Sequence, residues 1–148
     1  MVFCVEVLSG LWIGTTKLMK SDFSKKKKIN LLIKSNVDLD FIGNYQKYAD
    51  HIKPEIEKFE RQKCHHYLME TTELISLKID QGYNVLITDD TGVSYSSLIV
   101  LAYLIRYGQM NIQQAVKVWN SKISYGVKMT SECQRSLQVF FNHVGGHI

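Results

Sequence analysis

The chain has 148 residues, which is enough for one domain with a proper core, over residues 1–148, and too few for two ordinary domains. Hydrophobic residues make up 45% and charged residues 22%, an ordinary globular composition. A formal charge of +4 without a basic stripe argues against nucleic-acid binding. The longest apolar run, 98–105, is too short to span a membrane, and no basic segment precedes an apolar stretch at the N-terminus. We therefore expect no membrane anchor and an intracellular protein, cytoplasmic or nuclear, with reduced cysteines.

In the first half of the chain, hydrophobic patterning predicts short strands. Residues 2–13 alternate loosely and indicate one or two strands. A lysine run at 25–28 leads into an apolar strand at 29–33, which we expect to be buried. Residues 35–48 carry no clear pattern, and Pro54 breaks whatever element precedes it.

The second half reads mostly as helices around one strand. The predicted elements are a helix at 59–80, a strand at 85–87, a helix at 96–107, a helix capped by Asn111 with Gln114 completing a capping box, and a last helix capped by Thr130 or Ser131. Alternation of strands and helices followed by further helices predicts an α/β domain with helices packed on a sheet.

Three adjacent residues, Cys64, His65 and His66, raise the question of a metal site. No second pair of ligands follows at a spacing typical of zinc sites. Neighbouring residues on a helix also face different directions. We therefore expect these side chains to diverge, and we expect neither a metal nor a cofactor.

The most informative segment runs from the strand at 85–87 through a loop centred on Gly92 into the helix that begins at Ser96. A strand, a small-residue loop and a helix N-terminus together form the geometry that binds phosphate through backbone N–H groups. This loop, however, carries two adjacent carboxylates, Asp89 and Asp90, and no Lys or Arg.

This segment resembles the signature of the dual-specificity branch of the protein tyrosine phosphatases, His-Cys-x-x-Gly-x-x-Arg-Ser, which is followed by a helix containing a phrase close to Val-x-Ala-Tyr-Leu. The helix here reads Val-Leu-Ala-Tyr-Leu over 100–104. In the loop, Gly92 and Ser96 match, whereas Thr88, Asp89 and Tyr95 stand at the histidine, cysteine and arginine positions. The corresponding loop of this chain consists of Thr88, Asp89, Asp90, Thr91, Gly92, Val93, Ser94, Tyr95 and Ser96.

The resemblance extends over most of the chain. Residues 8–14 look like the family's opening strand, 110–115 like the start of its next helix, and 131–141 like its closing helix. The resemblance implies a protein tyrosine phosphatase-like fold of the dual-specificity type, in which helices flank a central sheet.

The family's chemistry is missing from the corresponding positions. In active members the cysteine attacks phosphorus, the arginine binds two phosphate oxygens, and an upstream aspartate protonates the leaving group. The position of that general acid falls near Lys58, where no aspartate stands; Glu57 or Glu60 could substitute. The resemblance therefore implies a catalytically inactive, STYX-type pseudophosphatase that binds a protein, with a phosphoprotein or a kinase among the partners the family suggests.

Three alternatives stay open. Asp89 could be the aspartyl nucleophile of a magnesium-dependent phosphatase, although the two aspartates of haloacid-dehalogenase-like enzymes are separated by one residue. Asp89 and Asp90 could instead cap the following helix. The lysine run at 25–28 resembles peptides that dock on mitogen-activated protein kinases, but it also reads as a solvated lead into a core strand, or as a weak site for nucleic acid or anionic lipid.

Overall fold

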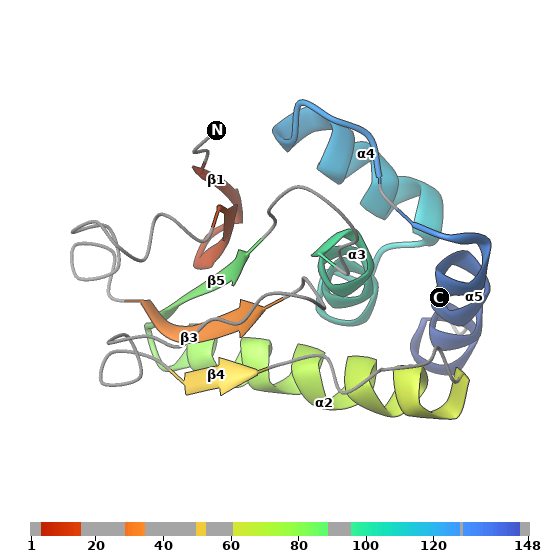
Figure 1. Cartoon of the computed structure of the whole chain (residues 1–148), viewed down its shortest axis with the longest axis horizontal. Helices are drawn as coiled ribbons and strands as arrows, with labels where there is room; N and C mark the ends of the chain where they lie inside the picture. The colour runs from red at the N-terminus through yellow and green to blue at the C-terminus, as the bar shows by residue number, and fades with distance from the viewer. Residues whose placement is uncertain are drawn as a thin grey trace.

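A computed structural model describes residues 4–15, 29–34, 50–52, 61–88, 96–127 and 129–145 of the chain. In these ranges five strands form one sheet and four helices pack beside it (Figure 1). The strands are β1 (Cys4–Leu8), β2 (Leu11–Gly14), β3 (Ile29–Lys34), β4 (Asp50–Ile52) and β5 (Asn84–Thr88). The helices are α2 (Arg61–Asp80), α3 (Ser96–Tyr107), α4 (Ile112–Lys122) and α5 (Ser131–Val144). This arrangement confirms the predicted α/β class.

The sheet has the order β1-β2-β5-β3-β4, with β1 antiparallel to β2 and the other neighbours parallel. Strand β5 is central, and Ile87 pairs with Ile13 of β2 on one side and Ile33 of β3 on the other. Residues 85–88 are fully buried. A parallel strand with both faces covered reads as a continuous apolar run, which explains why β5 was recognisable in the sequence.

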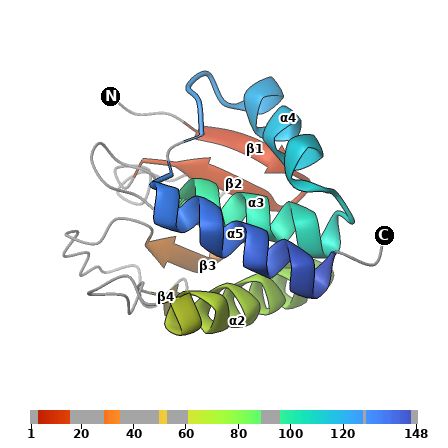
Figure 2. The same cartoon turned by 90° about the vertical axis from the view of Figure 1, so that its right-hand side faces the viewer.

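The helices form two layers on one side of the sheet. Figures 1 and 2 show α3 against the sheet, α5 on the far side of α3, α4 above β1 and α2 along the lower edge. Helix α3 is therefore enclosed, and every residue from Ser96 to Ile105 is buried. A helix that is apolar all round is stable only in such an interior position.

One prediction about the N-terminal half needs correction, and one strand there was not predicted. Residues 8–14 are not one opening strand, because Ser9 and Gly10 form a turn between β1 and β2. Gly10 has a φ of +91°, which favours glycine, and its backbone N–H donates to the Glu6 carboxylate. Strand β4 was not predicted at all, since it spans three residues and pairs only with β3.

The predicted caps of the last two helices are confirmed. The Asn111 side chain accepts from the Gln114 backbone N–H, and the Gln114 side chain accepts from the Asn111 backbone N–H. Thr130, one of the two predicted alternatives, caps α5 and accepts from the Cys133 N–H. Helix α5 continues to Val144, three residues beyond the stretch that resembled a closing helix.

The core gathers the apolar faces of both layers, with Trp119, Phe140 and Leu11 among its largest fully buried side chains. Phe140 is fully buried in this core, and Phe141 is partly buried against it. The strand at 29–33 is buried as expected, apart from the half-buried Asn30. None of the described helices has the length and apolar character needed to cross a bilayer.

Candidate functional site

The frame of the signature loop is present in the structure. Strand β5 ends at Thr88 and helix α3 begins at Ser96, both at the carboxyl edge of the parallel strands. The Thr88 hydroxyl donates to the Ile33 carbonyl oxygen at 3.4 Å, which ties the end of β5 to β3. The strand–loop–helix order predicted around Gly92 is therefore confirmed at both of its ends.

Most of the loop itself lies outside the described residues. Of the nine positions singled out by the sequence, the structure places Thr88 and Ser96, and it does not describe Asp89, Asp90, Thr91, Gly92, Val93, Ser94 and Tyr95. The general-acid position near Lys58 and the lysine run at 25–28 also lie outside the described residues. The structure therefore describes the strand and the helix that flank the loop, and these two elements form the frame of the site.

The described part of the frame is polar but buried. Thr88, Ser96 and Ser97 are fully buried, and Thr15, which follows β2 at the same edge, is 5% exposed. The register pairs Gly14 with Thr88, so Thr15 lies next to the end of β5. Hydroxyl groups can donate to or accept from a loop that covers them, but they supply neither a thiolate nor a permanent charge.

All three cysteines of the chain lie elsewhere in the fold. Cys4 is in β1, Cys64 is fully buried in α2, and Cys133 is buried in α5. Burial raises the pKa of the Cys64 thiol to about 11, which keeps it protonated and unreactive near neutral pH. All three cysteines therefore lie on elements other than the loop, which itself contains no cysteine.

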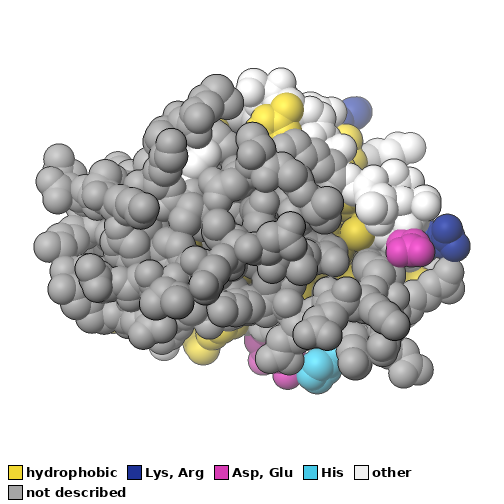
Figure 3. Space-filling view, viewed as in Figure 1, with side chains coloured by type: hydrophobic (Ala, Val, Ile, Leu, Met, Phe, Trp, Pro, Cys, Tyr) yellow, Lys and Arg dark blue, Asp and Glu magenta, His cyan; other side chains and the backbone are white. Residues whose placement is uncertain are grey.

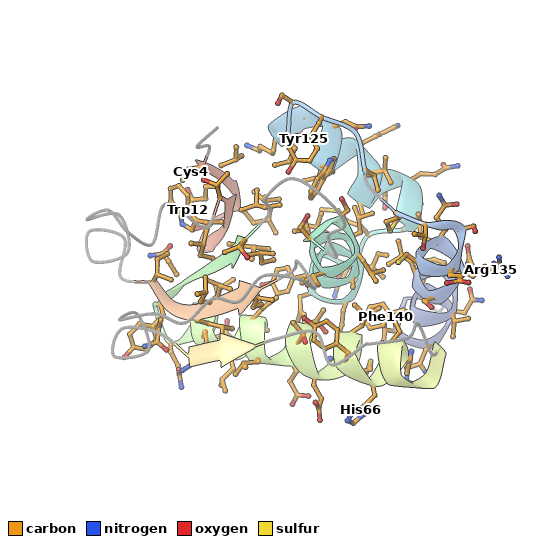
Figure 4. All side chains as sticks on the ribbon, viewed as in Figure 1. Cys4, Trp12, His66, Tyr125, Arg135 and Phe140 are labelled. Atoms are coloured by element: carbon orange, nitrogen blue, oxygen red, sulfur yellow. The ribbon has the colours of Figure 1, made fainter. Side chains whose placement is uncertain are left out.

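The arginine that follows the loop on α3 is hydrogen-bonded to another helix. Arg106 lies ten positions after Ser96, roughly 15 Å along α3 at the helical rise per residue. Its Nη1 donates to the Met69 carbonyl oxygen at 2.8 Å and to the Thr72 hydroxyl at 3.2 Å, so it joins α3 to α2. Arg135 is exposed on α5 and points away from the domain (Figure 4). Arg106 is therefore held by α2, and Arg135 lies on the outer face of α5.

No local pattern indicates the role of Arg106, because its partners lie more than 30 residues away in the chain. Such a contact depends on how α2 and α3 pack. Thr72 in turn donates to the Leu68 carbonyl oxygen at 2.7 Å, so the guanidinium meets a hydroxyl whose own proton is already used.

The Cys64, His65 and His66 side chains diverge as predicted. Cys64 is buried, His65 is half-buried against α5, and His66 is exposed. His66 Nε2 lies 2.9 Å from a carboxylate oxygen of Glu70, one turn later on the same helix. In the part of the chain that the structure describes, no three His, Cys, Asp or Glu side chains come together as a metal site would require.

Comparison with protein families identifies one match. Residues 11–142 match the model of the dual specificity phosphatase catalytic domain. This range includes every described element from β2 to α4 and nearly the whole of α5. A comparison with curated protein sequences finds no match.

Solved structures give the same result for the fold. The chain superposes on a leucine rich repeat and phosphatase domain containing protein from Entamoeba histolytica with a TM-score of 0.77 at 15% identity, covering 97% of this chain and 94% of the other. Human DUSP28 gives 0.77 at 15% identity, with 95% and 93% covered. The human tyrosine phosphatase-like serine/threonine/tyrosine-interacting protein gives 0.74 at 21% identity, with 93% and 94% covered. These likenesses confirm the expected fold.

Proposed function

Because the chain belongs to the dual specificity phosphatase family, we propose that it is a catalytically inactive member that acts as a protein-interaction or regulatory module. The observation that carries the proposal is the contrast between frame and chemistry. Strand β5 and helix α3 bracket the loop as a phosphatase requires, while Asp89 and Tyr95 occupy the positions of the nucleophile and the phosphate-binding arginine.

Loss of the cysteine alone would abolish turnover, but loss of the arginine also removes the grip on the substrate. Charge-assisted hydrogen bonds to phosphate contribute about 1.5–3 kcal/mol each. Arg106, the arginine that follows the loop on α3, is bonded to Met69 and Thr72 and does not compensate. The proposal therefore extends from absent catalysis to absent binding of phosphate.

The charges of the loop work in the same direction. Asp89 and Asp90 are adjacent carboxylates at the mouth of the loop, and a phosphate dianion is repelled by both. A pair of unit charges about 4 Å apart interacts by roughly 4 kcal/mol at the effective dielectric near a protein surface. Carboxylates near a helix N-terminus are themselves favourable, so these two are suited to occupy the position of the anion.

The retained family fold supports an interaction role, since a domain without its chemistry still presents the surfaces of its family. A phosphoprotein or a kinase are partner classes that the family resemblance suggests. Affinity purification from the native cell, followed by mass spectrometry, would identify the partner.

A phosphatase assay tests the absence of catalysis. The purified chain is incubated with para-nitrophenyl phosphate and with phosphopeptides, with and without magnesium, beside an active member of the family. We expect no turnover above the blank in any arm. Turnover that requires neither magnesium nor Asp89 would show that another group is the nucleophile and would overturn the proposal.

A second candidate function remains in view because Asp89 directly follows β5, a buried parallel strand. A carboxylate at the carboxyl end of such a strand is where an aspartyl nucleophile stands in magnesium-dependent phosphatases. Turnover in the magnesium arm that disappears in Asp89→Asn and persists in Asp90→Asn would establish this enzyme in place of the inactive module.

A further inference from the structure

Helices α2 and α5 meet through a pair of histidines that the signature loop does not involve. The rings of His65 on α2 and His143 on α5 lie edge to face, with centroids 5.1 Å apart and planes at 88°. His65 also contacts the Phe140 ring at 5.9 Å. Since 78 residues separate the two histidines, only the packing of the helices brings them together.

We propose that the His65–His143 contact is an acid-sensitive clamp, which holds the C-terminal half of α5 on α2 at neutral pH and releases it when both rings are protonated. This role is independent of the proposed function, because it depends on the contact between α2 and α5 and not on the signature loop (Figure 2).

The environment of His65 suits the neutral ring and not the charged one. Its Nδ1 is buried and has no hydrogen-bond partner among the residues that the structure describes. A neutral imidazole can leave this atom as an unprotonated nitrogen, whereas an imidazolium must place an N–H donor there. Burial, His143 and then His66 all lower the pKa of His65. Protonation of His65 therefore places a positive charge where burial shields it from water. It also places an N–H donor where no acceptor lies among the described residues.

The second ring supplies the like charge. His143 is exposed, and its ring meets the His65 ring edge to face. When both rings are protonated, two positive charges lie about 5 Å apart and repel each other. Double protonation is thus the state that the contact does not tolerate.

The described neighbours do not neutralise this charge. On α2, the Glu70 carboxylate is paired with the exposed His66 at 2.9 Å, and both side chains are at least 70% exposed on the outer face (Figures 3 and 4). Cys64 stays neutral because burial raises its pKa. On α3, the charged group that faces α2 is Arg106. It is a cation, and it bonds to the carbonyl oxygen of Met69, which lies one turn after His65.

The described charged groups of α5 also lie away from His143. Cys133 lies near the start of α5 beside Cys64, and the exposed Glu132 and Arg135 lie in the first turns, about three and two turns from His143. The residues one turn before His143 are Val139 and Phe140. No described carboxylate on either helix therefore replaces the lost contact.

The end of α5 is the part that release would affect. Phe140 is fully buried, and Gly145 is packed so closely that a Cβ there would lie 2.9 Å from the Phe141 ring and 3.4 Å from Ile105.

Because the folded state lowers the pKa of His65, it binds fewer protons than the unfolded state. The stability of this contact is therefore present above the ordinary histidine pKa of about 6.5 and is lost as the pH falls below it.

Hydrogen exchange of the full chain, read by mass spectrometry, tests the clamp. Protection factors, corrected for the intrinsic exchange rate, are compared about one pH unit above and about one and a half below the ordinary histidine pKa. We expect amides at 140–144 to lose roughly tenfold or more in protection at the lower pH, while those at 98–105 of α3 lose less than about threefold.

Two matched variants identify the group responsible. His143→Gln removes the partner ring from an exposed position, and His66→Gln makes the same change on the adjacent exposed residue that pairs with Glu70. We expect the pH-dependent loss to fall below about threefold in His143→Gln and to persist in His66→Gln. Equal loss in α3 and α5, no loss in the natural chain, or a response in His143→Gln like that of the natural chain would each overturn the clamp.

A histidine titration followed by NMR provides an independent measurement on the same proteins. His65 should protonate below the ordinary histidine pKa, and its pKa should rise in His143→Gln because the lowering by that neighbour is gone. An unchanged His65 pKa in that variant would also overturn the proposal.

Discussion

Replacing Arg106 with methionine should weaken the joint between α2 and α3. The guanidinium donates to the Met69 carbonyl oxygen at 2.8 Å and to the Thr72 hydroxyl at 3.2 Å, and its Cζ lies 5.1 Å from the centre of the Tyr107 ring. Methionine keeps most of the aliphatic stem, so the substitution removes the charge-assisted bonds and leaves most of the packing.

The expected cost follows from these contacts. A hydrogen bond from a charged donor contributes about 1.5–3 kcal/mol, and the lower part of this range applies because Arg106 is partly exposed. The Met69 carbonyl oxygen is not orphaned, since inside α2 it also accepts the helical hydrogen bond from the backbone N–H four residues later. We therefore expect Arg106→Met to lower the free energy of unfolding by about 2 kcal/mol. For a domain of this size, that corresponds to a fall in Tm of roughly 4–8 °C.

Urea and thermal unfolding followed by circular dichroism measure this effect. Arg135→Met on the exposed face of α5 is the matched control and should change stability by less than about 0.5 kcal/mol. Arg106→Lys keeps the charge without the fork and should fall between the two. If Arg106→Met were no more destabilising than Arg135→Met, the guanidinium would not be the joint that its distances indicate.

Three further predictions concern the loop, a cap and a thiol. Asp89→Cys alone should stay inactive, whereas Asp89→Cys with Tyr95→Arg should bind tungstate in a calorimetric titration and hydrolyse aryl phosphate only weakly, since a missing general acid costs about 10²–10⁴-fold; a folded double variant that binds no oxyanion would show that the loop is no longer a cradle. Asn111→Ala should lower the free energy of unfolding by about 1 kcal/mol through loss of the capping box, and an equal loss in Asn120→Ala, an exposed position on α4, would contradict this reason. Cys64 should resist iodoacetamide at neutral pH until urea unfolds the chain, because its thiol is buried and its pKa is raised to about 11; rapid labelling of the folded protein, read by mass spectrometry, would contradict this.

Elements with local signals can be predicted from the sequence alone. The apolar run of β5, the enclosed helix α3 and the Asn111–Gln114 cap can all be read from neighbouring residues, and the structure places each where the pattern predicted it. The site could be located for the same reason, since Thr88 and Ser96 mark the ends of one strand and one helix. The substitutions at Asp89 and Tyr95 are likewise facts of the sequence, and they carry the proposed loss of activity.

Contacts between distant segments follow from the tertiary packing and cannot be predicted from local sequence. Strand β4 is too short to show a period of its own and exists through its pairing with β3. The bonds of Arg106 to α2 and the contact of His65 with His143 join residues that nothing in the local sequence relates. Local patterns report which face of an element is apolar, whereas the partner of a polar side chain depends on which helices the buried core brings together.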